Sequence, residues 1–285
     1  MRLLREFTTS NVLNRWMVSA LSSIGILAAV AGILDAFFPD VFEPRGWAYL
    51  GIVFAVSVLW ATFDAWPLEK YTRNFSELNT TITIEIGDLF EQPGHLVIGM
   101  TDTFDTALPR IITERSIQGQ LLMREYGGKV TKLDREIART LKDVQPIKVE
   151  TVQNKPDGKR KRYSIGTVIS LGSVHRYYYC CAYSYMSNAL VAQATPESLW
   201  TGLFNVWQAV RDSSQQATVS MPLVGSGLAK LSNQLCRKDI LRLILLSFVA
   251  ASRERVVTKH LKIIIHPDDV RDISMMELIE TLKGI

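Results

Sequence analysis

A glycine-containing loop in the last third of the chain carries the strongest chemical signal. Residues 221–229 read MPLVGSGLA, with a strand expected before them and a long helix after them. Glycines let a backbone come close to a ligand and expose successive N–H groups, which is how such loops hold a diphosphate. The start of the following helix adds partial positive charge. The loop is not a Walker A motif, because no Gly-Lys-Ser/Thr follows, and a plain strand-to-helix connection is the alternative.

Carboxylates follow two further expected strands. Asp88 lies in the segment IEIGDLF (84–90), and the segment VIGMTDTFDT (97–106) ends in a dense row of polar side chains. In an open α/β sheet, ligands bind beyond the carboxyl ends of the strands, so these loops would converge with the glycine loop. An aspartate at that place can accept a hydrogen bond from the exocyclic amine of a base, whereas a polar loop with Asx turns is the alternative. The predicted polar rim consists of Thr101, Asp102, Thr103, Asp105 and Thr106 around Phe104.

Alternating strands and helices must position these loops. Alternation and β-branched residues predict strands at 80–86, 95–100, 147–152, 163–170, 177–185, 218–221 and 260–265, with a hairpin turn at 154–158. Apolar spacing predicts helices at 111–126, 132–142, 196–212, 232–252 and 274–283. Fully apolar strands such as 263–265 indicate a sheet that is covered on both faces. The expected fold class is α/β, a three-layer α/β/α domain with a mixed sheet.

Two long uncharged segments precede this domain. Residues 16–34 contain no charge, the apolar stretch continues to residue 38 with only Asp35 interrupting it, and residues 46–63 are uncharged again. About 20 helical residues cross the ~30 Å hydrocarbon core of a bilayer, so both segments are predicted as transmembrane helices. A signal peptide followed by a core helix is the alternative, but a signal peptide has a shorter apolar region. The predicted organisation is a cytoplasmic N-terminal segment (1–15), a first span (16–38), an extracytoplasmic turn (39–45), a second span (46–66), a linker (67–79) and the α/β domain (80–285).

Basic residues place both ends of this hairpin in the cytoplasm. Three arginines precede the first span and Lys70 and Arg73 follow the second, whereas the turn holds only Arg45. The positive-inside rule therefore predicts a two-span protein of the bacterial inner membrane with cytoplasmic termini. An odd number of cysteines, two of them adjacent, fits a reducing compartment, and the scattered histidines indicate no metal site. Residues 80–285 carry 26 Lys and Arg against 21 Asp and Glu, a net charge of +5 that is too small to indicate nucleic-acid binding.

Two other patterns have functional alternatives. Gly25 with Ala29, and Ala28 with Gly32, form small-xxx-small pairs that let membrane helices approach closely, although small residues are also common in such helices. The basic run KRKR at 159–162 follows the expected hairpin turn. A solvated hairpin tip is the first interpretation of this run, and contact with anionic lipid head groups is the second.

Three motifs in this order resemble a macro domain, the ADP-ribose-binding fold: GDL at 87–89, the strand-to-loop segment 97–106, and PLVGSGL at 222–228. The resemblance covers residues 80–285. It implies that Asp88 recognises adenine beside the Leu89 backbone. It also implies that the glycine loop wraps the diphosphate and the distal ribose through Gly225, Ser226, Gly227 and Leu228.

A narrower resemblance rests on four segments and the predicted spans. TDTFDT (101–106), SIQGQL (116–121), YSIGT (163–167) and PLVGSGL are similar to the macro domain of transmembrane–macro effectors of type II Thoeris anti-phage defence. This resemblance adds Ser116, Gln118 and Gly119 to the expected ligand-binding residues. In such systems a TIR-domain partner converts NAD into an ADP-ribose-derived signal, in this branch histidine–ADP-ribose, which the macro domain senses.

The resemblance implies a membrane-anchored sensor–effector rather than an enzyme, with no cofactor, metal or catalytic residue. Ligand binding would drive the protein to oligomerise and to disrupt the inner membrane, which arrests or kills the infected cell. One departure bears on activity: macro domains that remove ADP-ribose often carry an NAAN-like loop, and GMTDTFDT stands here at 99–106. Asp102 or Asp105 could still orient a water, so a membrane-tethered ADP-ribosyl hydrolase is the alternative, or these carboxylates could contact the amine and imidazole of histidine. A membrane-anchored scaffold with a vestigial pocket is a third interpretation.

Overall fold

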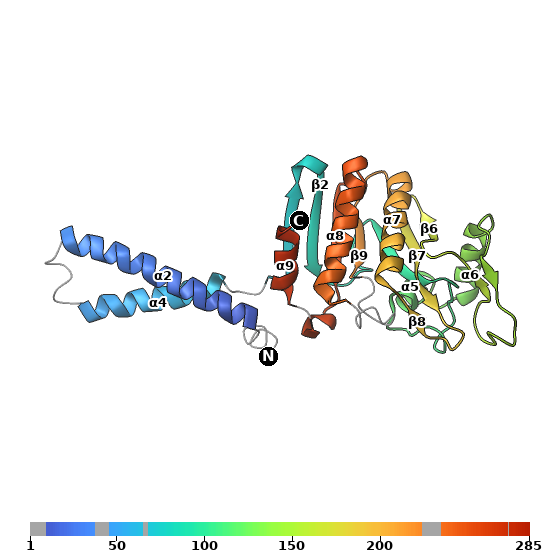
Figure 1. Ribbon diagram of the computed structural model, residues 1–285, viewed down its shortest axis with the longest axis horizontal. Coiled ribbons are helices and arrows are strands. Elements are labelled where there is room, and N and C mark those ends of the chain that lie inside the picture. Colours follow the sequence, from blue (N-terminus) through green and yellow to red (C-terminus); the bar gives the residue numbers. More distant parts are fainter. Residues whose placement is uncertain (1–9, 38–45, 65–67, 224–234, 273) are drawn as a thin grey trace. The chain divides into compact units, whose positions relative to one another are not determined.

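The computed structural model describes residues 10–37, 46–64, 68–223, 235–272 and 274–285 of the 285-residue chain. The chain divides into two compact units, one of residues 1–69 with 274–277 and one of residues 70–273 with 278–285 (Figure 1). The first unit contains the two predicted membrane helices, and the second contains every strand that the structure describes.

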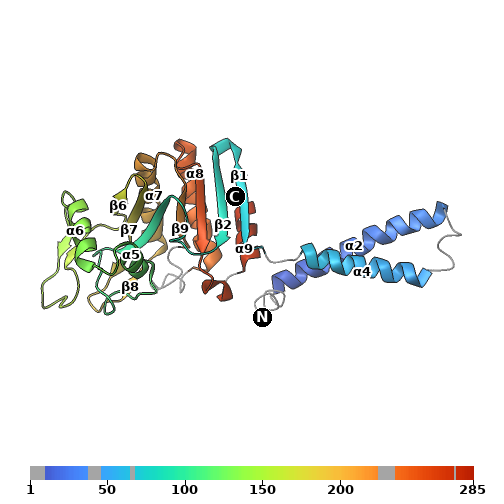
Figure 2. The ribbon, with the colours of Figure 1, turned by 180° about the vertical axis from the view of Figure 1, so that it is seen from behind.

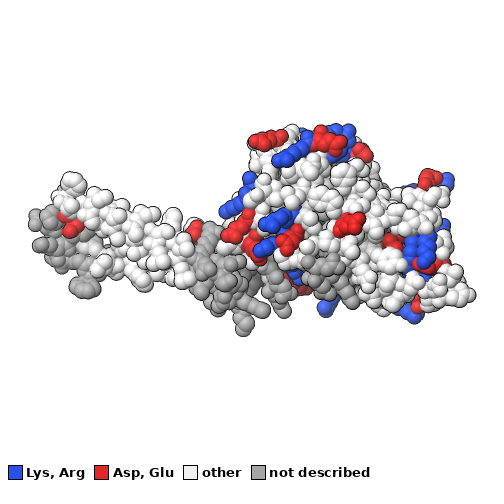
Figure 3. Space-filling model, in the orientation of Figure 1, with Lys and Arg blue, Asp and Glu red and all other residues white. Residues whose placement is uncertain are grey.

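The first unit is a pair of helices, α2 (Ser10–Phe37) and α4 (Gly46–Asp64). Small side chains let the two helices pack closely, because Ala20 and Ala61 are buried. Trp16 Nε1 donates a hydrogen bond across the pair to Thr62 Oγ1 at 3.3 Å. Most large apolar side chains of both helices are exposed, and the visible face of the pair is uncharged over most of its length (Figure 3). An apolar exterior of this kind suits a lipid environment better than water.

One of the two helices meets the length and composition required of a membrane span. Trp16–Phe37 of α2 has 22 residues and is apolar enough to cross a bilayer, while α4 offers a shorter apolar stretch, Ala48–Asp64. The first predicted span (16–38) is thus supported by length and composition, and the two-span arrangement stays a prediction. A Cβ added at Gly25 or Gly32 would meet no atom within 4 Å. The predicted small-residue pairs therefore take no part in the contact between α2 and α4.

An eight-stranded mixed sheet forms the centre of the second unit. Its strands are β1 (Lys70–Phe75), β2 (Thr80–Ile86), β3 (His95–Thr101), β6 (Val168–Ser173), β7 (Arg176–Met186), β8 (Ala192–Gln193), β9 (Val219–Pro222) and β10 (His260–Ile265). The order is β1-β2-β10-β9-β3-β7-β6, and β8 pairs with β7 off this path. β2, β10, β9, β3 and β7 are parallel, whereas β1, β6 and β8 are antiparallel to their neighbours. β4 (Lys148–Val149) and β5 (Lys161–Arg162) form a separate antiparallel pair.

Helices cover both faces of the sheet. They are α5 (Ile117–Glu125), α6 (Val130–Thr140), α7 (Pro196–Ser213), α8 (Arg237–Glu254) and α9 (Met275–Lys283), with 3-10 turns η2 (Ser76–Leu78) and η4 (Asp269–Asp272). Tyr178 and Cys180 of β7 belong to a core shared with α5 and α6. On the other face, α7 packs against β7 and lies beside α8 (Figure 1). Trp207 of α7 is fully buried, meets the Phe248 ring edge-on at 5.2 Å and donates to Ser247 Oγ at 2.9 Å. The predicted α/β fold with a mixed sheet is confirmed.

The pairing of strands differs from the prediction at two places. Residues 70–75, predicted as part of a linker (67–79), form strand β1 at one edge of the sheet (Figure 2). Exposed and half-buried side chains alternate along this strand, as is typical of an edge strand. On the half-buried side, Arg73 Nη1 donates hydrogen bonds to the Leu282 and Lys283 carbonyls of α9 at 2.6 and 2.7 Å. The segment 147–152 does not pair with 163–170 as predicted, because β4 pairs with β5 and β6 pairs with β7. The local sequence does not reveal these pairings, because β1 is mostly polar and β4 and β5 have only two residues each.

The fold makes stability depend on pH through a buried histidine at the start of β3. His95 Nδ1 accepts from the Tyr177 N–H at 3.0 Å, so Nε2 donates to the Ser214 carbonyl at 3.3 Å and the ring is neutral. Burial lowers the pKa of His95, an effect that the Ser214 bond opposes and that Arg176 adds to. The unfolded chain therefore binds the proton first, and stability is lost as pH falls below the ordinary value of about 6.5.

We expect the free energy of unfolding to be lower at about pH 5.5 than at about pH 7, and His95→Asn to flatten that dependence. Urea denaturation of the full chain at both pH values measures it. Burial also lowers the pKa of His260. The free energy of unfolding of the His95→Asn variant should therefore still decrease somewhat as the pH falls. The matched control is His175→Asn at an exposed turn position, and an equal effect of both substitutions would contradict the assignment.

Candidate ligand-binding site

Two of the predicted motifs lie at the carboxyl ends of the parallel strands, and the strand before the third motif ends there too. Because β2, β10, β9, β3 and β7 run in the same direction, their carboxyl ends lie along a common edge. Asp88 follows β2, the loop 101–106 continues from β3, and the glycine loop follows β9. This edge is where open α/β sheets bind ligands.

Asp88 is held in a fixed orientation at the end of β2. Its Oδ1 accepts from the Phe90 N–H at 2.8 Å, which forms an Asx turn, and its Oδ2 pairs with Arg124 of α5 at 2.7 Å. The side chain of Leu89 is buried in the core. A ligand amine that approaches Asp88 would thus share a preoriented carboxylate with Arg124.

The loop 101–106 is not the exposed polar rim that the sequence predicts. Every side chain from Thr101 to Thr106 is buried. Asp102 Oδ1 accepts from the Met186 N–H and Oδ2 pairs with Arg162 Nη1, both at 2.7 Å. Burial raises the pKa of Asp102, and the bonds from Met186 and Arg162 oppose that shift. This carboxylate stabilises the fold and is already occupied.

Both carboxylate oxygens of Asp105 are also engaged in hydrogen bonds or an ion pair. Its Oδ2 accepts from Thr103 Oγ1 at 2.6 Å and from Lys155 Nζ at 3.2 Å, and its Oδ1 accepts from the Lys159 N–H at 2.5 Å. Phe104, with a φ of 50°, packs its ring edge-on against Tyr163 at 5.8 Å. The same loop continues into Thr106, whose hydroxyl donates to Asp134 of α6 at 2.5 Å. Neither aspartate is free to orient a water or to bind a ligand cation in this conformation.

The basic run 159–162 supplies part of this buried network. The sequence predicts a solvated hairpin tip, but Arg162 is only 2% exposed and bonds to Asp102, Glu150 and Asn188, each at 2.7 Å. The bond from Arg162, followed by that from Lys148, lowers the pKa of Glu150. The signal that could have found the network is charge complementarity between TDTFDT and the basic run, which lie far apart in the sequence.

The first turn of α5 supplies a polar group with no partner. Ser116 caps the helix by accepting from the Gly119 N–H at 3.0 Å, so α5 begins later than the predicted residue 111. Gly119 is required there, because a Cβ would lie 2.1 Å from the Thr113 carbonyl oxygen. Gln118 Nε2 is buried and has no hydrogen-bond partner among the residues that the structure describes. An N–H donor at a helix start suits an anionic or carbonyl-rich ligand.

Gly225, Ser226, Gly227 and Leu228 lie outside the described residues. The described flanks are β9, which ends at Pro222, and α8, which begins at Arg237 after Cys236. Among the residues that the structure describes, no group of three His, Cys, Asp or Glu side chains is placed to hold a metal ion.

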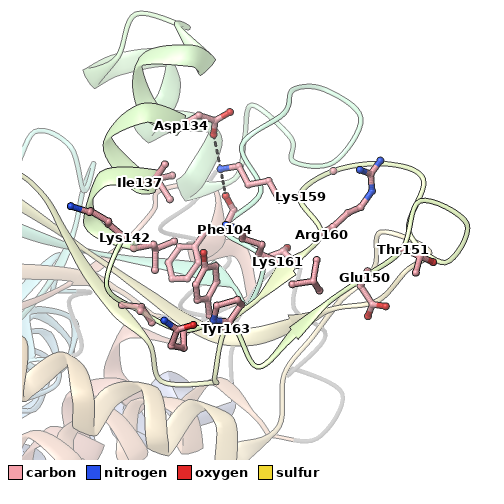
Figure 4. Close-up of a pocket in the computed structure, with 18 of the residues that line it drawn as sticks. Phe104, Asp134, Ile137, Lys142, Glu150, Thr151, Lys159, Arg160, Lys161 and Tyr163 are labelled. Carbon is pink, nitrogen blue, oxygen red and sulfur yellow. Dashed lines mark hydrogen bonds and ion pairs between the residues drawn. The ribbon is translucent and has the colours of Figure 1, made fainter.

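A cleft of about 1160 Å³ opens between α6 and the segment 144–163 (Figure 4). Phe104, Ile137, Leu141 and Tyr163 give it an apolar floor. Lys159 crosses it, donating to the Phe104 carbonyl at 2.7 Å and pairing with Asp134 at 2.5 Å. The sequence gives no indication of this cleft, because its walls come from a helix and a segment that do not pair.

Comparison with known proteins places the chain in a family. Residues 82–266 match the family model described as Thoeris protein ThsA, Macro domain. The chain belongs to this ThsA macro-domain family. Thoeris protein ThsA of Bacillus amyloliquefaciens (strain Y2) is 26% identical over 210 residues, which cover 71% of this chain and 68% of that protein.

Solved structures agree on the fold. A macrodomain mutant from Oceanobacillus iheyensis has a TM-score of 0.51 at 12% identity and covers 76% of this chain and 100% of its own. A second mutant of that macrodomain, solved with ADPR, has a TM-score of 0.50 at 13% identity and covers 75% of this chain and 97% of its own. The ThsA macro-domain match begins in β2 and ends just after β10, so it contains every segment of the candidate site and excludes α2, α4 and α9.

Proposed function

We propose that this ThsA-type macro domain binds an ADP-ribose-derived signal of anti-phage defence and passes its occupancy to a membrane anchor. The observation that carries the proposal is the family match over 82–266, which includes the segments that follow the parallel strands β2, β3 and β9. Asp88 would accept from the adenine amine, Gln118 would donate to the ligand, and the glycine loop would hold the diphosphate. The signal, with histidine–ADP-ribose as its expected form, would come from a TIR-domain partner.

Titration of the full chain in detergent tests the ligand. Calorimetry should give saturable heat with ADP-ribose or histidine–ADP-ribose, and absence of heat with both compounds would overturn the proposal. Mass spectrometry of the ligand recovered after incubation separates sensor from enzyme. Unchanged ligand is expected for a sensor, whereas catalytic release of ADP-ribose would establish the hydrolase.

A sensor is favoured over a hydrolase by the state of the loop after β3. Both aspartates that could orient a water are bonded to buried cations, Asp102 to Arg162 and Asp105 to Lys155. A general base must reach the reacting water directly or through one further water. We therefore propose a binding protein without catalytic residues.

The Gln118→Leu variant tests the ligand contact without lowering the stability of the protein. Replacing Gln118 by Leu removes a buried donor that no described residue pairs with, so stability should be unchanged or raised. Ligand affinity should fall by about tenfold, the effect of one hydrogen bond of roughly 1.4 kcal/mol. Gln120→Leu, at a neighbour whose Nε2 already bonds to the Arg115 carbonyl, is the control for calorimetry. Equal affinities for the two variants would remove Gln118 from the site.

We propose that α2 and α4 form the anchor, with both helices spanning the inner membrane. The exposed apolar side chains on both helices support this arrangement. Oligomerisation on ligand binding would then gather hairpins and disrupt the bilayer. Only a ligand that binds one state more tightly can drive such a change. Dye-loaded vesicles that carry the full chain should leak when ligand is added, and vesicles that stay intact at saturation would remove the membrane-disruption step.

Replacing Ile26 by Arg tests the anchor itself. Ile26 is exposed near the middle of the apolar stretch of α2, and a central arginine costs about 2.5–3.5 kcal/mol of insertion free energy. The fraction of protein that resists a sodium carbonate wash of membranes should fall. Leu246→Arg, at an exposed position of α8, should leave that fraction unchanged, and an equal loss in both variants would contradict a specific role for α2.

A further inference from the structure

A basic and apolar segment of the second unit has no role in the proposed function. It comprises residues 147–161, from the residue before β4 to the first residue of β5, and is called the arm below. The arm holds five Lys and Arg and two Asp and Glu, a net charge of +3. It forms one wall of the cleft beside α6, so one side of it has no helix packed against it (Figure 4).

Three aliphatic side chains of the arm are exposed, and two of them, Val149 and Val152, line the cleft beside α6. Ile147, Val149 and Val152 are 66%, 60% and 55% exposed. Lys161, which pairs with Val149 across the two strands, is also exposed and forms no ion pair with another described residue. Single exposed aliphatic residues are ordinary, but three on one short segment beside lysine and arginine are typical of a surface that enters a lipid interface.

The arm is rigid, so this display is built into the fold. Its inward side chains Glu150 and Lys155 are buried and pair with Arg162 and Asp105. Its backbone is bonded at Glu150 N–H to the Arg160 carbonyl at 2.9 Å. Asp157, its other carboxylate, is neutralised by Arg110 at 2.6 Å. A rigid arm loses little conformational entropy when it meets a surface.

The arm and the first residue of β1 both lie at the carboxyl ends of the parallel strands. Lys70, the first residue of β1, pairs with Glu85 near the carboxyl end of β2. The arm is bonded to the loop 101–106 at the carboxyl end of β3, and β2 and β3 point the same way. Strands are about 4.8 Å apart, and only β10 and β9 separate β2 from β3. The first residue of β1 and the loop that holds the arm therefore lie at the same ends of the strands, with β2, β10 and β9 between β1 and β3.

We propose that the arm is a second membrane contact, in which Ile147, Val149 and Val152 enter the headgroup region and Lys161 and Arg160 bind anionic phospholipid. This inference rests on the proposed membrane anchoring. The arm is bonded to the loop that follows β3, at the carboxyl ends of the parallel strands, where the candidate ligand site also lies. Anionic lipid would thus hold the carboxyl edge of the sheet close to the bilayer surface.

A fluorescent label on the arm of the full chain tests the proposal. Cys236→Ser removes the exposed thiol, and burial raises the pKa of Cys180 and Cys181, so both stay unlabelled. Val149→Cys then carries an environment-sensitive dye in nanodiscs of phosphatidylcholine, with or without phosphatidylglycerol. Val174→Cys is the matched control, since Val174 is 47% exposed in the β6–β7 turn at the opposite edge of the sheet.

With phosphatidylglycerol, the emission of the dye at position 149 should shift to shorter wavelength. Its quenching by acrylamide should fall about twofold. The dye at 174 should not change, and Lys161→Glu should reduce the shift at 149. If the two dyes behave identically while the protein stays anchored, the arm does not contact lipid and the proposal is overturned. The exposed surface of the arm would then fit a protein partner instead. Release of the protein from vesicles by carbonate would overturn the anchoring instead, so the two failures are distinguishable.

Discussion

Replacing Arg162 by Met should lower the free energy of unfolding by about 3–5 kcal/mol, because it leaves the Asp102 carboxylate buried without its cation. Arg162 and Asp102 are each 2% exposed, and the guanidinium also lies over the Tyr185 ring at 4.3 Å. Methionine is similar in length and keeps much of the packing, so the loss reports the missing charge and hydrogen bonds. Urea denaturation of the full chain, followed through the buried Trp207, measures the change.

Arg255→Met is the matched control for that measurement. Arg255 pairs with Asp212 at 3.0 Å, and both side chains are exposed. Exposed pairs contribute about 0–1 kcal/mol, so this variant should unfold almost as the parent chain does. If Arg162→Met lowers the free energy of unfolding as little as the control does, water reaches Asp102 and the network does not hold the loop after β3.

The strands in the middle of the sheet are predictable from local sequence. Residues 80–86 and 260–265 are β2 and β10 at the predicted bounds, because each is a run of β-branched or aliphatic residues that a covered sheet requires. β1 escapes prediction because its residues, KYTRNF, are mostly polar. An edge strand needs only one apolar side, and the Arg73 bonds to α9 that complete it join residues at opposite ends of the domain.

The candidate site shows the same division between local and distant causes. The cap at Ser116 begins α5 later than the predicted residue 111, but both this cap and the Asx turn at Asp88 depend on neighbouring residues alone. The loop 101–106 does not, because a row of Thr and Asp reads as a solvated surface until its partners are known. Those partners, Lys155 and Arg162, follow Asp105 and Asp102 by 50 and 60 residues, and burial of both charges together is what makes the loop a part of the core.

Replacing Gly119 by Ala should weaken binding of an ADP-ribose-derived ligand by more than about tenfold, or 1.4 kcal/mol. The added Cβ would lie 2.1 Å from the Thr113 carbonyl oxygen and 2.8 Å from Glu114 Cα. Both are backbone atoms, so the first turn of α5 must move away from residues 113–114 and carry the Ser116 cap and Gln118 with it. Crowding of this kind costs about 1–3 kcal/mol of stability, which leaves enough folded protein for calorimetry.

Gly284→Ala adds the same methyl group where the nearest atom is 3.5 Å away, so it should alter neither stability nor affinity. The comparison also separates two explanations of a loss of binding. If the Gly119→Ala chain is folded yet binds weakly, and Gln118→Leu is stable yet binds weakly, the start of α5 contacts the ligand. If Gly119→Ala binds as tightly as the parent chain, the ligand lies elsewhere along the carboxyl edge, and the glycine loop after β9 must hold the diphosphate without help from α5.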